Sequence, residues 1–136
     1  ALLSGIALAN SGLGMAHGVA AALGVHCKIP HGLACAVMLP VALRVNQTVA
    51  QRRLAELARE CGHGTDDSTD TQLADEFIER IEGLCQSVNI PSKLSDLGVT
   101  KSQLPEIVKS SRGNSMSGNP RELTDTELQG IMEGML

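Results

Sequence analysis

The sequence has almost no aromatic residues, because it contains one Phe and neither Tyr nor Trp. Proteins that bind single-stranded nucleic acid stack the bases on aromatic side chains, and this chain offers hardly any. It also lacks an excess of positive charge: its formal net charge is −4, whereas a surface that binds nucleic acid is basic. We therefore do not expect nucleic acid to be a partner.

The chain also lacks the cysteine pairs that mark zinc ribbons and redox motifs, because no C-x-x-C occurs in it. We expect reduced, mostly buried thiols at Cys27, Cys35, Cys61 and Cys85, and no metal role for Cys27 or Cys35. The apolar residues 1–10 have no basic segment of the signal-peptide type and are too short and too interrupted to span a membrane. These features predict a cytoplasmic protein with no membrane partner.

No stretch alternates apolar and polar residues as a half-buried strand does, so we predict an all-α, bundle-like fold in a single domain over residues 1–136. Helices are expected over residues 2–10 and 13–25, and another from His31 that kinks or ends at Pro40. Further helices are expected over residues 48–61 and 69–88 and after Thr100 and Thr124, with polar loops over 62–69 and 110–119.

The amphipathic pattern also predicts which side chains of two helices face the core. For residues 48–61 the expected inner face is Val49, Leu54, Leu57 and Cys61. For residues 69–88 it is Leu73, Phe77, Ile78, Ile81, Leu84 and Val88.

Residues 12–40 are nearly free of charge, yet they carry three of the four histidines. An imidazole in such an apolar segment needs a hydrogen-bond partner or a ligand. His17 shares a helix face with Ala20, Ala21 and Gly24, and Pro30 starts a new helix with His31 in its first turn. Histidines on successive antiparallel helices can converge on one ion, and imidazole suits iron, zinc, copper and nickel.

The alternative is that both imidazoles are hydrogen-bonded core histidines at a helix junction. His26 is nine residues beyond His17, on the opposite face of the same helix, and is not expected to bind metal.

The same stretch resembles the metal-binding segment of the iron-containing (group III) alcohol dehydrogenases. In that family a G-x-x-H-G helix is followed by P-H-G-x-x-x-A-x-x-L-P, and residues 14–18 and 30–40 match these motifs. Residues 42–46, 89–91 and 118–121 match further family segments, so the resemblance covers essentially the whole chain. It implies the helical C-terminal half of the family fold, which is dehydroquinate synthase-like.

The resemblance implies that His17 and His31 are two metal ligands, and that the remaining aspartate and histidine ligands lie in an upstream region. It implies Fe²⁺ (or Zn²⁺) as the metal and NAD or NADP as the cofactor, held mainly by an N-terminal dinucleotide-binding domain absent here. The implied reaction is reversible hydride transfer between an alcohol and an aldehyde or ketone, with the metal as Lewis acid. The expected partners are that domain, a small alcohol or aldehyde substrate, and a second copy in a homodimer.

One position departs from the family pattern, because Ala21 stands where the family often has another histidine one turn after the first ligand. This puts a proton-relay role at that position in doubt. Two alternatives stay open: a non-catalytic helical interaction domain, and a zinc-dependent relative of the glycerol dehydrogenases. Whether the enzyme is the iron-type or the zinc-dependent relative, this segment alone is expected to be inactive, because half of the metal site lies elsewhere.

Overall fold

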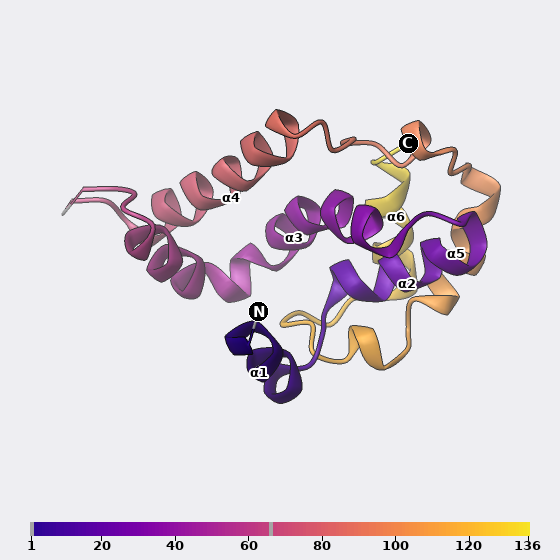
Figure 1. Ribbon diagram of the computed structural model, residues 1–136, viewed down its shortest axis with the longest axis horizontal. Coiled ribbons are helices and arrows are strands. Elements are labelled where there is room, and N and C mark those ends of the chain that lie inside the picture. Colours follow the sequence, from indigo (N-terminus) through magenta and orange to yellow (C-terminus); the bar gives the residue numbers. More distant parts are fainter. Residues whose placement is uncertain (1, 66) are drawn as a thin grey trace.

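The computed structural model describes residues 2–65 and 67–136, and in these residues it contains helices and no strand (Figure 1). The predicted all-α fold is therefore confirmed. Asp66, in the predicted loop 62–69, lies outside the described residues, as does Ala1. The α-helices are α1 (Leu2–Ser11), α2 (Met15–Cys27), α3 (His31–Glu60), α4 (Asp70–Ser87), α5 (Leu104–Ser110) and α6 (Asp125–Glu133), with 3-10 turns η1 (Ser95–Leu97), η2 (Lys101–Gln103) and η3 (Asn114–Met116).

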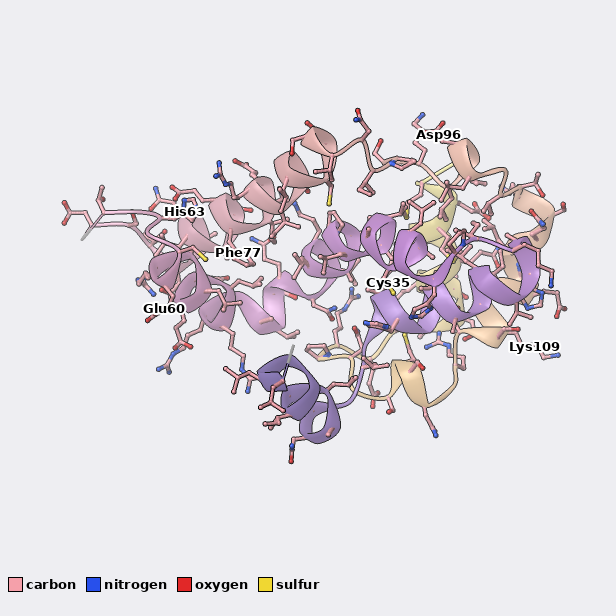
Figure 2. All side chains as sticks on the ribbon, in the orientation of Figure 1. Cys35, Glu60, His63, Phe77, Asp96 and Lys109 are labelled. Atoms are coloured by element: carbon pink, nitrogen blue, oxygen red, sulfur yellow. The ribbon has the colours of Figure 1, made fainter. Side chains whose placement is uncertain are left out.

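Helices α2, α3 and α4 follow one another in alternating directions, whereas α5 packs on α2 and α6 packs on α5 (Figure 1). The main core lies where these helices meet. It is built from aliphatic and methionine side chains, as the near absence of aromatics requires. Its fully buried members include Met15, Val19, Leu23, Met38, Leu104, Ile107, Leu128 and Met132. The single aromatic residue, Phe77, packs elsewhere, in two small clusters between α3 and α4 (Figure 2).

Helix α3 was expected to kink or to end at Pro40, and it does not end there. It runs for 30 residues and includes most of the segment 48–61, which was expected as a separate helix. Proline in a helix interior leaves the carbonyl four residues earlier without its donor. Here that carbonyl belongs to Ala36, and the Cys85 thiol of α4 donates to it at 4.0 Å. Because a thiol is a weak donor, this contact replaces the lost backbone hydrogen bond only in part.

By length and composition alone α3 is apolar enough to cross a membrane, with a mean hydropathy of 1.4 over its most apolar window. Residues 5–11 of α1 and the whole of α2 form a bent pair of helices, and together they pass the same test. Core helices of soluble proteins also pass it. Arg44 of α3 forms ion pairs with Asp75 and Glu82 of α4.

Several predicted core positions are exposed, and the prediction was wrong for them. In residues 48–60 of α3 the buried side chains are Leu54, Ala55 and Ala58, where small residues let α4 approach closely. The positions expected inside but exposed are Val49, Leu57, Cys61, Leu84 and Val88. The expectation of mostly buried thiols was also wrong, since Cys61 is exposed and the other three are partly buried, although all four are free.

The predicted helix starts at Thr69 and Thr124 are confirmed as capping boxes. Each threonine hydroxyl accepts a hydrogen bond from the N–H three residues later, and the Gln72 or Glu127 side chain accepts one from the threonine N–H. The hydrogen bonds from Thr124 lower the pKa of Glu127, so its carboxylate stays charged at the positive end of α6.

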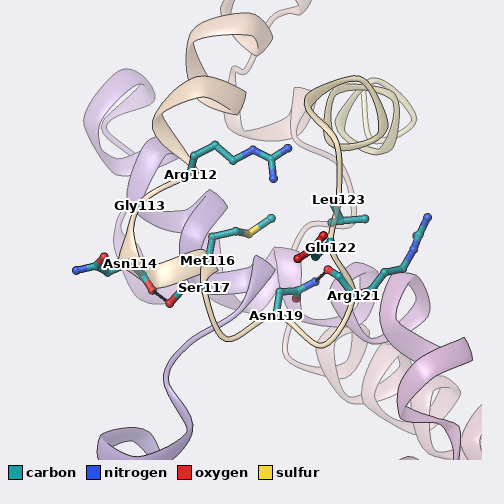
Figure 3. Close-up of a pocket in the computed structure, with 9 residues that line it drawn as sticks. All are labelled: Arg112, Gly113, Asn114, Met116, Ser117, Asn119, Arg121, Glu122 and Leu123. Atoms are coloured by element: carbon teal, nitrogen blue, oxygen red, sulfur yellow. Dashed lines mark hydrogen bonds between the residues drawn. The ribbon is translucent and has the colours of Figure 1, made fainter.

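Two asparagines join the loop after η3 to the helices. The amides of Asn46 and Asn119 donate to each other at 3.0 and 2.9 Å, and Asn46 is buried. Asn119 Oδ1 also accepts from the N–H of Met15, at the start of α2, and Asn119 Nδ2 donates to the Arg121 carbonyl (Figure 3). Gly118 donates its N–H to the Leu13 carbonyl at 2.7 Å. The N-terminus of α2 is therefore fixed on α3 and on this loop.

Gly18 lets α2 lie close against the segment after α5. A Cβ at Gly18 would lie 3.0 Å from the Ser111 carbonyl oxygen and 3.1 Å from two atoms of Met116. The carbonyl is backbone and cannot turn aside as a flexible side chain would. A glycine at this position is therefore required by packing.

We expect Gly18→Ala to lower the free energy of unfolding by about 1–3 kcal/mol, because overpacking outweighs the higher helix propensity of alanine. Gly83→Ala is the matched control, since Gly83 is also helical but a Cβ there meets nothing within 4 Å. That change should raise stability by about 0.5–1 kcal/mol. Urea unfolding followed by circular dichroism measures both, and equal effects of the two changes would contradict the packing argument.

Candidate metal centre

The positions of His17 and His31 follow from how α2 and α3 begin. His17 lies in the first turn of α2, which Asn119 holds in place through the N–H of Met15. After α2, Lys28 adopts a left-handed conformation with φ 60° and Pro30 is extended with ψ 131°. This turn brings the chain back along α2 (Figure 1). His31 is the first residue of α3 and reaches the turn of α2 that carries His17.

The two imidazoles are in direct contact. His17 Nδ1 lies 3.2 Å from His31 Nε2, and the ring centroids are 5.3 Å apart at an interplanar angle of 42°. His31 is exposed and His17 is partly buried. The structure therefore brings the two sequence-predicted residues together, at a place open to solvent. Metal ligation by them stays a prediction.

The spacing suits one metal ion shared by both rings. Zinc–nitrogen bonds of about 2.0–2.1 Å in a tetrahedral site place two ligating nitrogens about 3.3 Å apart. The observed 3.2 Å separation matches this value. Neutral imidazole nitrogens are ligands for both zinc and iron, so the donors present fit the metals that the sequence predicts.

A third donor belongs to the cluster although the sequence analysis gave it no metal role. Cys35 Sγ lies 3.5 Å from His17 Nδ1 and 3.4 Å from His31 Nε2, and all three atoms lie within 4.8 Å of one another. Cys35 is partly buried between α2 and α3 (Figure 2). Burial raises the pKa of its thiol, so the thiol keeps its proton when no ion is bound. The sequence did hold a signal, since Cys35 is four residues after His31 on one helix face.

The remaining candidate positions lie apart from this cluster. His26 Nε2 is 2.7 Å from the Ser110 hydroxyl, so this histidine joins α2 to the end of α5. Within the described residues it belongs to no group of potential metal ligands. Ala21, which stands one helical turn after His17, is exposed.

The loop after α5 lines a hollow of about 380 Å³ (Figure 3). Its two arginines do not form an anion site, because each already has a carboxylate partner. Arg112 pairs with Asp125 at 2.7 Å and Arg121 pairs with Glu127 at 2.5 Å. The histidine cluster is therefore the stronger candidate for chemistry.

Comparison with known proteins identifies the family of the chain. The sequence profile of the Fe-containing alcohol dehydrogenase family, C-terminal, matches residues 1–136. The chain is 32% identical to lactaldehyde reductase of Escherichia coli K12 and 35% identical to 1,3-propanediol dehydrogenase of Citrobacter freundii. Each comparison covers 96% of this chain and 34% of the relative. The chain thus spans about a third of the length of these relatives.

Solved structures show the same fold. A 1,3-propanediol oxidoreductase superposes with a TM-score of 0.92 at 30% identity, over 99% of this chain and 36% of the other. An alcohol dehydrogenase from Oenococcus oeni superposes with a TM-score of 0.89 at 31% identity, over the same shares of the two chains.

If one ion is held by both rings, His17→Ala should weaken Zn²⁺ binding to the chain by at least about tenfold. His26→Ala is the control, because that ring contacts Ser110 instead. Isothermal titration with Zn²⁺ measures both affinities. Equal affinities in the His17→Ala variant and the unaltered chain would show that the ring contact is only a hydrogen bond.

Proposed function

We propose, because this chain belongs to the Fe-containing alcohol dehydrogenase family as its C-terminal helical domain, that it supplies half of the metal centre of an NAD(P)-dependent alcohol dehydrogenase. The observation that carries this proposal is the 3.2 Å approach of His17 Nδ1 to His31 Nε2. The proposed reaction is reversible hydride transfer between a small alcohol and its aldehyde or ketone. The names of the relatives, lactaldehyde reductase and 1,3-propanediol dehydrogenase, support small substrates of this class.

The chain's own contribution is to hold and expose the metal. His17 and His31 would bind Fe²⁺ or Zn²⁺, and the bound ion would supply Lewis-acid polarisation of the substrate oxygen. The exposure of His31 leaves one side of the cluster open to the rest of the enzyme and to substrate. The small, exposed Ala21, one turn after His17, leaves that part of the helix surface open.

The dinucleotide is expected to bind outside this segment. Dinucleotide sites of the common type need a glycine-rich turn between a strand and a helix, and the described residues contain no strand. A related crystal structure, a sulfoacetaldehyde reductase from Bifidobacterium kashiwanohense, is a complex with NAD⁺, and this chain matches 30% of its length. We propose that NAD or NADP is held mainly by the N-terminal part of the full-length protein, in the cytoplasm, where free thiols persist.

A helical interaction module is a second candidate, and the apolar surface of α1 favours it. Leu2 and Leu3 are 78% and 81% exposed, and Ile6 is 52% exposed. Contiguous exposed apolar residues mark interaction surfaces. This role is compatible with a metal centre in the same chain, because α1 and the histidine cluster occupy separate places.

The proposed function is tested in the full-length enzyme that contains this segment. His31→Ala should lower kcat/KM for oxidation of 1,2- or 1,3-propanediol by at least about a hundredfold, with loss of bound metal in elemental analysis. His26→Ala should keep both. Full turnover in a chelated enzyme without detectable metal would contradict the proposed mechanism, and the identity of the recovered metal decides between the iron and zinc assignments.

A further inference from the structure

The partly buried side chain of Cys35 contacts both histidines. Its sulfur completes a triangle of donor atoms with sides of 3.2, 3.4 and 3.5 Å. The triangle joins two helices, since His17 comes from α2 whereas His31 and Cys35 come from successive turns of α3. The register of α2 on α3 therefore sets the two distances from His17, and the helical spacing of α3 sets the distance between His31 and Cys35.

The side lengths are compatible with a shared ion. A tetrahedral ion with bonds of about 2.05 Å to nitrogen and about 2.3 Å to sulfur places two nitrogens about 3.3 Å apart and nitrogen and sulfur about 3.6 Å apart. The observed nitrogen–nitrogen side is the shortest of the three, and both sulfur sides are longer.

Well-directed hydrogen bonds can account for at most two of the three contacts. An imidazole nitrogen carries either one proton or one lone pair, so each ring nitrogen makes one well-directed hydrogen bond. The triangle asks each of these two nitrogens to make two contacts. An ion that receives a lone pair from each donor satisfies all of them together.

We propose that Cys35 is a third metal-ligating side chain, so that this chain alone presents a His₂Cys donor set to a borderline-soft divalent cation such as Zn²⁺. The thiol loses its proton to solvent as the sulfur–metal bond forms, and no electron is transferred. Thiolate ligation favours zinc over harder cations. The inference rests on the proposed function, because it assigns a further ligand to the same centre.

Cobalt(II) is the probe for this site, because thiolate ligation gives Co²⁺ a charge-transfer absorption that nitrogen ligands do not give. In the 136-residue chain, Co²⁺ should produce this band with one ion bound per chain. Cys35→Ser should abolish the band and weaken Co²⁺ and Zn²⁺ binding by about ten- to a hundredfold. Circular dichroism shows whether each variant keeps its helices. If Cys35→Ser loses them, Cys35→Ala replaces it in the same titration.

Cys27→Ser is the matched control, because Cys27 is also partly buried and the pKa of its thiol is also raised by burial. It should keep the band, as should Cys61→Ser at the exposed thiol. A band that survives in Cys35→Ser, or no Co²⁺ binding at all, would overturn the role of Cys35.

The same titrations separate this inference from the proposed function. If Co²⁺ binds without the band, and His17→Ala alone abolishes binding, then the histidine centre stands and Cys35 is not a ligand. If His31→Ala leaves the metal content of the full-length enzyme unchanged, the proposed function fails as well.

Discussion

The packing of α2 against α3 is the constraint on which the candidate centre depends. Neither helix carries the site alone, because one supplies His17 and the other supplies His31 and Cys35. A shift of one residue along either helix would move a donor by about 1.5 Å and turn it by about 100°. The 3.2 Å contact between the rings therefore reports the register of the two helices.

That register is fixed at both ends of α2. At its start, Asn119 accepts from Met15 and forms a reciprocal amide pair with Asn46 of α3. At its end, the N–H of Lys28 is bonded to the Leu23 carbonyl, and Pro30 directs the chain back. Between them the interface is made of small and aliphatic side chains. Interiors packed at this density deform little, so the donors keep their places.

Local features of this fold could be predicted from the sequence, and features that depend on a second helix could not. The helix starts at Thr69 and Thr124 depend on residues three positions apart, and both are confirmed. Helix α3 continues through Pro40 in a segment where α4 packs along it. The exposure of Val49 depends on which side of α3 is covered by α4. Sequence periodicity contains neither fact.

The site shows the same division between local and distant causes. His17 and His31 were predicted from a motif, and the structure places them together. No metal role is expected for Cys35 from the sequence, because its spacing of four residues from His31 is a weak signal outside a C-x-x-C pair. The signal becomes stronger only when α2 brings His17 to within 3.5 Å of the Cys35 sulfur.

The most direct test is a crystal structure of the zinc-loaded chain with anomalous diffraction at the zinc edge. The account predicts one anomalous peak about 2.0–2.1 Å from His17 Nδ1 and His31 Nε2 and about 2.3 Å from Cys35 Sγ. A zinc peak elsewhere in the chain, with the two rings hydrogen-bonded to each other and without metal, would contradict it.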